Sequence, residues 1–204
     1  MNKNLNINND EILDIISECE KAGNPDMVYE FASTSKVTFA GGGISCVAAS
    51  KANLDDMKKS MTIQTIGYDK INQLRHVSFF KDKAGIDAHM LKHAAILKPK
   101  FDAVLEAFGK NLAGKGIAEW TVPNGGYFIS LDVYAGCAKK TVALCKEAGV
   151  TLTGAGATFP YGKDPDDKNI RIAPTFPSRD ELCKAVEILC ICVEITAIEK
   201  ILEK

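Results

Sequence analysis

The spacing of hydrophobic and polar residues predicts alternating helices and short strands from residue 10 onward. Apolar residues at three- and four-residue intervals predict helices at 10–22, 53–62, 69–81, 86–112, 137–148 and from 178 nearly to 204. Apolar or alternating runs bounded by turn residues predict strands at 28–32, 38–49, 127–133, 150–152 and 169–173. Pro99 falls inside the longest helix, where we expect it to kink or break the helix.

Residue types at the helix ends support this pattern. Asp10 is placed to cap the first helix, and Ser178 with Glu181 forms the capping-box pattern at the start of the last one. After residue 85 the predicted order is long helix, strand, helix, strand, strand, long helix. This order describes a self-contained α+β unit.

The first two predicted strands, 28–32 and 38–49, lack strict alternation. Such runs are typical of strands covered on both faces, as in an α/β sheet. Two strands are too few for a sheet of their own. They either join the C-terminal strands or belong to a larger sheet whose other strands are absent, and the pattern favours neither. In the second case we expect them to be exposed at an edge or covered by dimerisation.

Composition and charge narrow the class of protein. A net charge of −1 gives no field that would attract nucleic acid or an anionic membrane. The seven cysteines are odd in number and contain no CxxC pair, so a reducing cytosol fits better than a disulfide framework or a zinc ribbon. No apolar run reaches membrane-spanning length, and the Asn-rich residues 1–9 lack a signal-peptide core and are expected to be disordered. We therefore expect a cytoplasmic protein.

A lysine follows the first predicted strand, in the sequence Ser33-Thr34-Ser35-Lys36. At the end of a buried strand, desolvation disfavours the charged ammonium, and a neutral amine can attack an aldehyde to form a Schiff base. Neighbouring hydroxyls can donate to a phosphate, and the glycines at 41–43 allow a ligand to approach closely. Spacing alone leaves open the alternative of a strand end with a solvated lysine.

Arginine is rare in this chain, since only Arg75, Arg171 and Arg179 occur among the 25 basic residues. The planar guanidinium suits two-point capture of a carboxylate or phosphate, whereas either basic residue can supply surface charge. Arg171 lies at the centre of the predicted strand 169–173. It is therefore a candidate anion-binding residue, with a structural salt bridge as the alternative.

Four motifs in order resemble those of the class I/II aminotransferases, the fold-type-I enzymes that use pyridoxal phosphate. They are Ser33–Lys36, Pro123–Phe128, Gly149–Phe159 and Asn169–Ala173. The similarity is strongest to the aspartate and alanine groups of that family. It implies an α/β fold class, with an α+β C-terminal small domain and one or two strands of the family's large domain. On this basis residues 1–9 are an extension, 10–80 a remnant of the large cofactor-binding domain, and 81–204 the small domain.

The resemblance also implies a role for each matching residue. Lys36 would be the catalytic lysine that carries pyridoxal 5′-phosphate, and Ser33 and Ser35 would face its phosphate. Arg171 would bind the α-carboxylate of the substrate. The substrates implied are amino acids and 2-oxo acids, and the expected assembly is a homodimer.

Two departures from the family pattern limit this expectation. Many members have an arginine eight residues after the lysine, where this chain has Ile44. The family's elements upstream of the lysine, including the Asp that contacts the pyridine nitrogen, have no counterpart here. We therefore expect a C-terminal portion of an aminotransferase that is poorly active alone. The alternative is a non-enzymatic module that acts in oligomerisation or binding.

Three other groups of residues are weaker candidates. His89 and His93 stand four apart, as in a zinc-binding helix, but a third ligand is not evident and a solvated helix face explains them better. The segment 164–167 is acidic but lacks the pattern of a calcium loop, so it is interpreted as a turn. Arg75 and His76 lie where family members have their subunit interface, with surface charge as the alternative.

Overall fold

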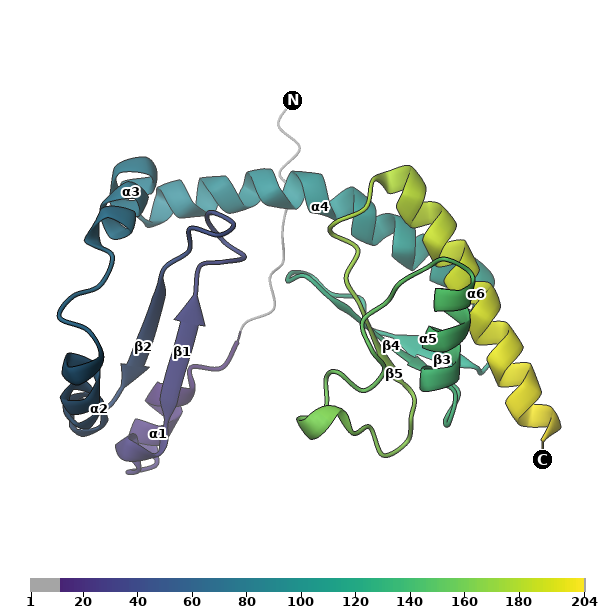
Figure 1. Ribbon diagram of the computed structural model, residues 1–204, viewed down its shortest axis with the longest axis horizontal. Coiled ribbons are helices and arrows are strands. Elements are labelled where there is room, and N and C mark those ends of the chain that lie inside the picture. The colour runs from purple at the N-terminus through teal and green to yellow at the C-terminus, as the bar shows by residue number, and fades with distance from the viewer. Residues whose placement is uncertain (1–11, 204) are drawn as a thin grey trace. The chain divides into compact units, whose positions relative to one another are not determined.

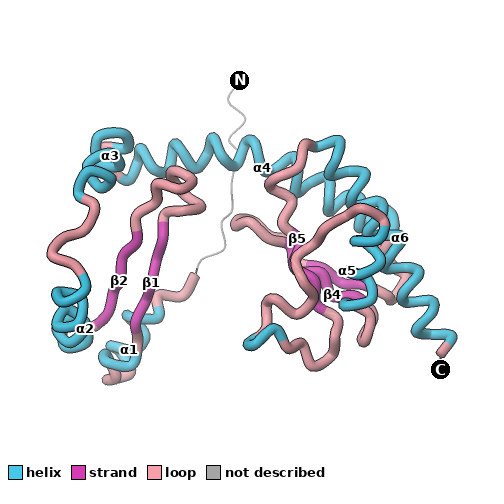
Figure 2. The backbone as a smooth tube through the Cα atoms, viewed as in Figure 1, coloured by secondary structure: helices cyan, strands magenta, loops and turns pink. Residues whose placement is uncertain are grey.

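The computed structural model describes residues 12–203, which form two compact units at 12–94 and 95–203. Figure 1 shows the elements along the chain, and Figure 2 shows that the strands belong to two separate sheets. The predicted extension 1–9 and the predicted cap Asp10 lie outside the described residues.

The unit 12–94 is built on an antiparallel hairpin. Its elements are α1 (Ile15–Lys21), the short 3-10 turn η1 (Pro25–Met27), β1 (Tyr29–Ser33), β2 (Ser45–Ala49), α2 (Lys51–Gln64), α3 (Lys70–Phe80) and the start of α4 (Lys83–Asn111). Tyr29 pairs with Ala49, and Ser33 pairs with Ser45. The first predicted strand is confirmed. The second is confirmed only at its end, because residues 34–44 form the connecting loop.

Side-chain caps set where the helices of this unit begin. The first helix begins at Ile15, and Asp14 is its cap, accepting the Ser17 N–H at 3.1 Å. Hydrogen bonds from the Ser17 hydroxyl and N–H lower the pKa of the Asp14 carboxyl. Ser50 and Asp69 cap α2 and α3 in the same way. The ends of helices thus follow the polar residues that can accept the otherwise unpaired N–H groups.

The junction of α3 and α4 requires a glycine. Lys81 adopts a positive φ of 65°, and the chain reverses into α4. A Cβ at Gly85 would lie 1.8 Å from the carbonyl oxygen of Phe80. Any side chain there would force the two helices to change their path.

Helix α4 continues through Pro99, so the break predicted there is absent. Proline removes one N–H and leaves the carbonyl four residues earlier without its helical donor. That residue is Ala95, and both Ala95 and Pro99 are exposed. Water can therefore satisfy the free carbonyl, which lets the helix continue.

The unit 95–203 combines a three-stranded antiparallel sheet with helices. Besides the end of α4, its elements are β3 (Ala118–Trp120), β4 (Ile129–Val133), α5 (Ala138–Glu147), the 3-10 turn η2 (Pro160–Gly162), β5 (Asn169–Ile172) and α6 (Arg179–Leu202). The strands lie in the order β3-β4-β5. The helices and antiparallel strands are those of an α+β unit, but β3 was not predicted. The capping box predicted at Ser178 is confirmed.

The strand predicted at 150–152 is absent. Gly149 takes a positive φ of 88° at the end of α5. The N–H of Val150 donates to the carbonyl oxygen of Cys145 at 2.8 Å, which closes the helix end. This backbone donor is consumed by the helix and cannot join a sheet.

The core of the unit 95–203 lies where α4, α5 and α6 meet one face of the sheet. Helices α5 and α6 lie side by side, as Figure 1 shows. The residues that are almost inaccessible to solvent include Val104, Phe108, Leu112, Ile129, Leu131, Ile170, Leu189 and Val193. Burying large apolar side chains of this kind stabilises a domain by about 1.5–3 kcal/mol each. This core holds β4 and β5 rigidly in register.

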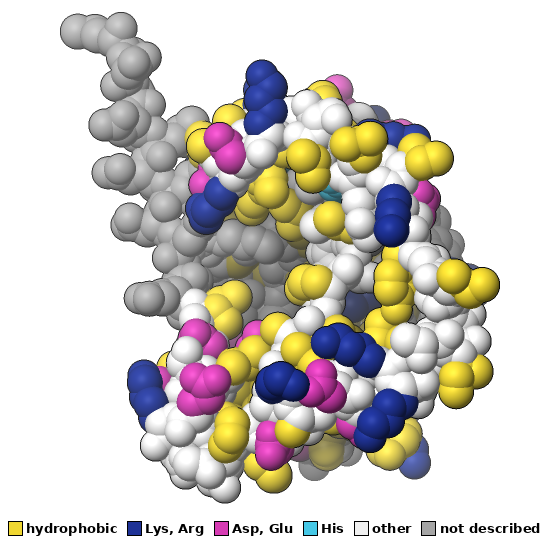
Figure 3. All heavy atoms as spheres, turned by 90° about the vertical axis from the view of Figure 1, so that its left-hand side faces the viewer, with side chains coloured by type: hydrophobic (Ala, Val, Ile, Leu, Met, Phe, Trp, Pro, Cys, Tyr) yellow, Lys and Arg dark blue, Asp and Glu magenta, His cyan; other side chains and the backbone are white. Residues whose placement is uncertain are grey.

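The hairpin of the unit 12–94 remains largely exposed within the described residues. The side chain of Phe31 on β1 is 73% exposed, and Ile66 between α2 and α3 is fully exposed. Figure 3 shows hydrophobic side chains spread among charged ones on one face of this unit. The predicted exposure of these strands is confirmed. The cover on both faces that is typical of such strands is not supplied by the described residues.

Asp164 organises the turn before β5. Its carboxylate accepts backbone N–H groups of Asp166, Lys168 and Asn169 at 3.0, 2.7 and 2.7 Å. Burial raises the pKa of this carboxyl, but the three donors outweigh burial and leave the pKa below its ordinary value. The acidic segment is therefore a turn, as predicted, and within residues 12–203 there is no group of three or more potential metal ligands.

No helix among the described residues is long and apolar enough to cross a lipid bilayer.

Candidate functional site

Lys36 lies in a tight turn that follows β1. The N–H groups of Val37 and Thr38 both donate to the carbonyl oxygen of Thr34 at 2.8 Å, which folds the chain around Lys36. The Lys36 side chain is exposed. The burial predicted for a lysine at the end of a covered strand is therefore not supplied by residues 12–203.

Ser33 and Ser35 lie next to each other at the start of this turn. Their hydroxyl oxygens are 2.6 Å apart, and the Ser35 N–H donates to Ser33 Oγ at 3.2 Å. Both residues are exposed. A cavity of about 130 Å³ lies beside them and is lined by Ala32, Ser33, Thr34, Ile44, Ser45 and Cys46. The two hydroxyls can rotate to donate to an anion, because neither is held by a buried partner.

The glycine run approaches the serines closely. A Cβ at Gly43 would lie 3.0 Å from both the backbone nitrogen and the hydroxyl oxygen of Ser35. Ile44, which stands where many family members have arginine, contributes its backbone instead. Its N–H donates to Thr34 Oγ1 at 2.9 Å, and its carbonyl accepts the Thr34 N–H at 2.8 Å. Both backbone groups of Ile44 are thus used within the loop, and position 44 offers no guanidinium to a ligand.

Arg171 lies on β5, opposite Ser130 on β4. Its guanidinium carbon is 4.6 Å from the centre of the Phe128 ring, a cation–π arrangement. Its Nε is buried and has no hydrogen-bond partner among residues 12–203. Among residues 12–203 no carboxylate lies within salt-bridge distance of Arg171, so the structural salt bridge considered from the sequence is not formed there. The hydrogen-bonding capacity of this guanidinium is therefore not fully used within residues 12–203, which is unusual for a buried donor.

Two further residues hold Arg171 in place, and sequence reasoning assigned neither a role. Phe128 supplies the ring beneath the guanidinium, and the only signal for it was its place at the end of the motif 123–128. Asn169 donates from Nδ2 to Ser130 Oγ at 2.8 Å and to Asp132 Oδ1 at 2.6 Å. Its Oδ1 accepts the Thr158 hydroxyl at 2.6 Å. A buried, fully bonded Asn two residues before Arg171 locks the register of β5 against β4.

Lys36 belongs to the unit 12–94 and Arg171 to the unit 95–203. The structure brings Ser33, Ser35 and Lys36 together in one turn. It places Arg171 with Phe128 and Asn169 in a second, separately built site.

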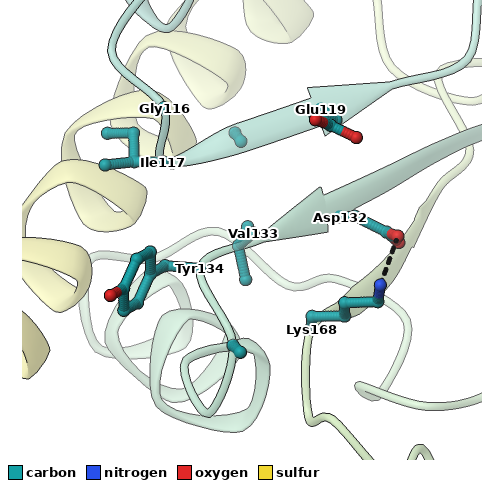
Figure 4. Close-up of a pocket in the computed structure, with 9 residues that line it drawn as sticks. Gly116, Ile117, Glu119, Asp132, Val133, Tyr134 and Lys168 are labelled. Atoms are coloured by element: carbon teal, nitrogen blue, oxygen red, sulfur yellow. Dashed lines mark ion pairs between the residues drawn. The ribbon is translucent and has the colours of Figure 1, made fainter.

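A larger cavity of about 300 Å³ lies in the unit 95–203, between β3, β4 and the start of β5. Figure 4 shows Glu119, Asp132 and Lys168 toward one side and Tyr134 and Ile117 toward the other. Lys168 Nζ pairs with Asp132 at 3.5 Å. None of the residues predicted from the sequence lines this cavity, and its one lysine already has a carboxylate partner, so it is not the candidate site.

The two histidines of α4 have a different environment from the one predicted. Their ring centroids are 4.3 Å apart, and both side chains are half-buried. His89 packs against Phe79 and Phe80, with ring centroids 5.9 and 5.2 Å apart. The prediction of a solvated helix face was wrong, because the rings of Phe79 and Phe80 at the end of α3 pack onto this face of α4. No third metal ligand joins the histidines among the described residues.

Comparison with known proteins agrees with the resemblance of the motifs. The sequence model of one family, described as aspartate amino-transferase, matches residues 2–204. An aspartate aminotransferase from Corynebacterium glutamicum is 47% identical over 189 residues, which cover 93% of this chain and 44% of that protein.

Solved structures agree as well. The crystal structure of an aspartate transaminase from Corynebacterium glutamicum matches with a TM-score of 0.89 and 46% identity over 94% of this chain and 45% of its own. A second match is the structure of an α-aminoadipate aminotransferase from Thermus thermophilus, which is complexed with N-(5′-phosphopyridoxyl)-L-leucine. It has a TM-score of 0.74 at 17% identity and covers 93% of this chain and 47% of its own. This likeness shows a shared fold. The chain thus spans less than half the length of these relatives. It belongs to the aspartate amino-transferase family, whose members are fold-type-I enzymes that depend on pyridoxal phosphate.

Proposed function

We propose that this chain supplies the cofactor lysine and the substrate-carboxylate arginine of an aminotransferase that moves an amino group between an amino acid and a 2-oxo acid. The observation that carries the proposal is Arg171, a half-buried arginine stacked on Phe128 whose Nε has no partner. The residue lies in a family match that covers residues 2–204. Within the chain, residues 10–80 would provide the cofactor lysine and residues 81–204 the carboxylate site.

The donor groups near Lys36 suit pyridoxal 5′-phosphate. The adjacent hydroxyls of Ser33 and Ser35 can both donate to a phosphate, and the close approach of Gly43 keeps this side of the turn free of a side chain. When bound, the cofactor supplies an aldehyde for the amino group and a ring that withdraws electrons from the substrate Cα. Because Ile44 offers no charge, hydroxyls and backbone N–H groups would carry phosphate recognition in this chain.

Lys36 has two tasks in this proposal. Its Nζ would bind the cofactor covalently and would move the proton that leaves the substrate Cα. A primary amine on a flexible stem can do both, because it reaches the same site from one fixed backbone position.

Arg171 binds the α-carboxylate of the substrate in this proposal. A guanidinium presents two parallel N–H donors to a carboxylate, which fixes the orientation of the Cα as well as its position. Stacking on Phe128 and the rigid register of β5 remove freedom from the arginine before the substrate arrives. The guanidinium is thus prepared for an anionic ligand.

Lys36 is expected to be the residue that pyridoxal phosphate modifies. Borohydride reduction of the protein with added pyridoxal phosphate, followed by peptide mapping, should place one label per chain on Lys36, since only this lysine has the two hydroxyls beside it. The variant Lys36→Ala should lose the label, and Lys51→Ala, which removes an exposed lysine of the same unit, should keep it. Labels scattered over many lysines would instead favour the binding-module alternative.

Arg171→Lys should weaken the binding of 2-oxoglutarate about tenfold or more, because the charge remains but the two-point contact is lost. Isothermal titration calorimetry measures the affinity in the wild type and in both variants in the same way. Arg179→Lys, at the exposed start of α6, is the matched control and should bind as the wild type does. Equal weakening in the two variants would contradict the role of Arg171.

The isolated chain should transaminate on the order of a hundredfold more slowly than a full-length relative, or not at all. The physical reason is that the chain spans 44% of the Corynebacterium relative, so the rest of the cofactor site is not present to orient the ring. Steady-state assays with aspartate and 2-oxoglutarate measure this directly. Turnover close to that of the full-length relative would overturn the expectation.

We also propose a homodimer that covers the exposed hairpin of the unit 12–94. Sedimentation velocity should show a dimer, and Phe31→Lys should shift it toward monomer, because Phe31 on β1 is 73% exposed and a charge there opposes association. Phe176→Lys, which alters a 97% exposed residue of the other unit, is the control and should remain dimeric. A wild type that stays monomeric at high concentration would refute the proposal.

A further inference from the structure

The turn that carries Lys36 is anchored at its first residue by the hairpin. The backbone N–H of Thr34 donates to the carbonyl oxygen of Ile44 at 2.8 Å. The Ile44 N–H in return donates to the Thr34 side-chain oxygen at 2.9 Å. Thr34 is therefore held through both its main chain and its side chain.

The last residue of the turn is anchored by helix α3. The Thr38 hydroxyl lies 2.8 Å from Nε2 of His76, and both residues are 6% exposed. The same hydroxyl lies 3.0 Å from the side-chain oxygen and 3.2 Å from the carbonyl oxygen of Thr34. Lys36 is thus only two residues from a fixed point on either side.

The contacts of His76 define which atom carries the proton. Its Nδ1 lies 2.9 Å from the carbonyl oxygen of Asn72, and a carbonyl can only accept. Nδ1 therefore bears a proton, and in the neutral ring Nε2 is an acceptor. With the ring neutral, the Thr38 hydroxyl donates to His76 Nε2, and with the ring charged, Nε2 donates to the Thr38 hydroxyl. In both cases one hydrogen bond, the shortest of the three contacts of this hydroxyl, joins Thr38 to α3.

Helix α3 also holds the other limb of the loop. Asn72 Nδ2 donates to the carbonyl oxygens of Gly42 and Gly43 at 2.9 and 3.2 Å. Phe39, the residue after Thr38, packs against His76 and Phe80 with ring centroids 5.1 and 5.3 Å away. Both limbs of the loop 34–44 are thereby tied to one face of a single helix.

We infer that α3 positions the cofactor lysine, and that His76 is the positioning residue that acts on Lys36 through Thr38. The inference rests on the proposed function of Lys36 and goes beyond it by assigning a role to a helix that does not touch the reacting atoms. The Lys36 side chain is exposed, so the place where its backbone is held decides where the amine can reach. A fixed backbone at Lys36 removes main-chain motion, which raises the fraction of time the amine spends within reach of the aldehyde.

Two pairs of variants separate this role from simple packing. His76→Gln keeps an acceptor near the position of Nε2, whereas His76→Leu removes it. Thr38→Ser keeps the hydroxyl, whereas Thr38→Val removes it at similar volume. Ser50→Ala is the control, because it removes a cap of α2 in the same unit without touching the loop.

The first readout needs no cofactor. Amide hydrogen exchange should be roughly five- to tenfold faster at Thr34, Val37, Thr38 and Ile44 in His76→Leu and Thr38→Val, as expected for the loss of one buried hydrogen bond. His76→Gln, Thr38→Ser and Ser50→Ala should exchange at these amides as the wild type does. Unchanged exchange in His76→Leu and Thr38→Val would show that His76 does not brace the turn and would overturn the inference.

The second readout is the rate at which pyridoxal phosphate and borohydride label Lys36. It should fall by a similar factor in His76→Leu and Thr38→Val and be retained in His76→Gln and Thr38→Ser. Faster exchange with an unchanged labelling rate would overturn the positioning role while leaving the proposed function intact. A wild type that labels no lysine selectively would overturn both, and the exchange data would then report only a structural brace.

Discussion

Both β-sheets of this chain have apolar faces that must be covered, and the way in which each is covered governs the rest of the structure. In the unit 95–203, helices α4, α5 and α6 close over one face of the three-stranded sheet and bury side chains such as Phe108 and Leu131 completely. That burial is the main source of stability for the unit. It also makes β5 a rigid support, and Arg171 owes its fixed position to this rigidity.

The two-stranded hairpin of the unit 12–94 has no comparable core, and Phe31 remains mostly exposed. Order in the loop beyond the hairpin comes from polar contacts instead. Thr34 is bonded to Ile44, Thr38 to His76, and Asn72 to two glycine carbonyls. A network of this kind fixes direction more than it adds stability, because each hydrogen bond contributes only about 1 kcal/mol net. It suits a segment that has to present one side chain accurately.

The two candidate groups therefore differ in how much of their environment this chain supplies. Arg171 has its aromatic support, its strand register and its neighbouring polar network within one unit. Lys36 has its backbone anchored but its side chain exposed. A carboxylate site can operate with one well-placed guanidinium, whereas a covalent cofactor also needs contacts around its ring. This difference is the physical basis for expecting labelling at Lys36 to be easier to observe than transamination.

The helices, the family and the candidate residues could be predicted from the sequence, because caps, periodic apolar positions and short motifs depend on residues near one another in the chain. The capping box at Ser178 and the strand around Arg171 were predictable for that reason. Which polar atoms have partners could not be predicted in this way. The unpaired Nε of Arg171 and the bond between Thr38 and His76, 38 residues apart, depend on how distant segments pack. Helix α4 runs through Pro99 without a break because solvent reaches the carbonyl group that Pro99 leaves free, and the strand predicted at Val150 is absent because its N–H closes the end of α5.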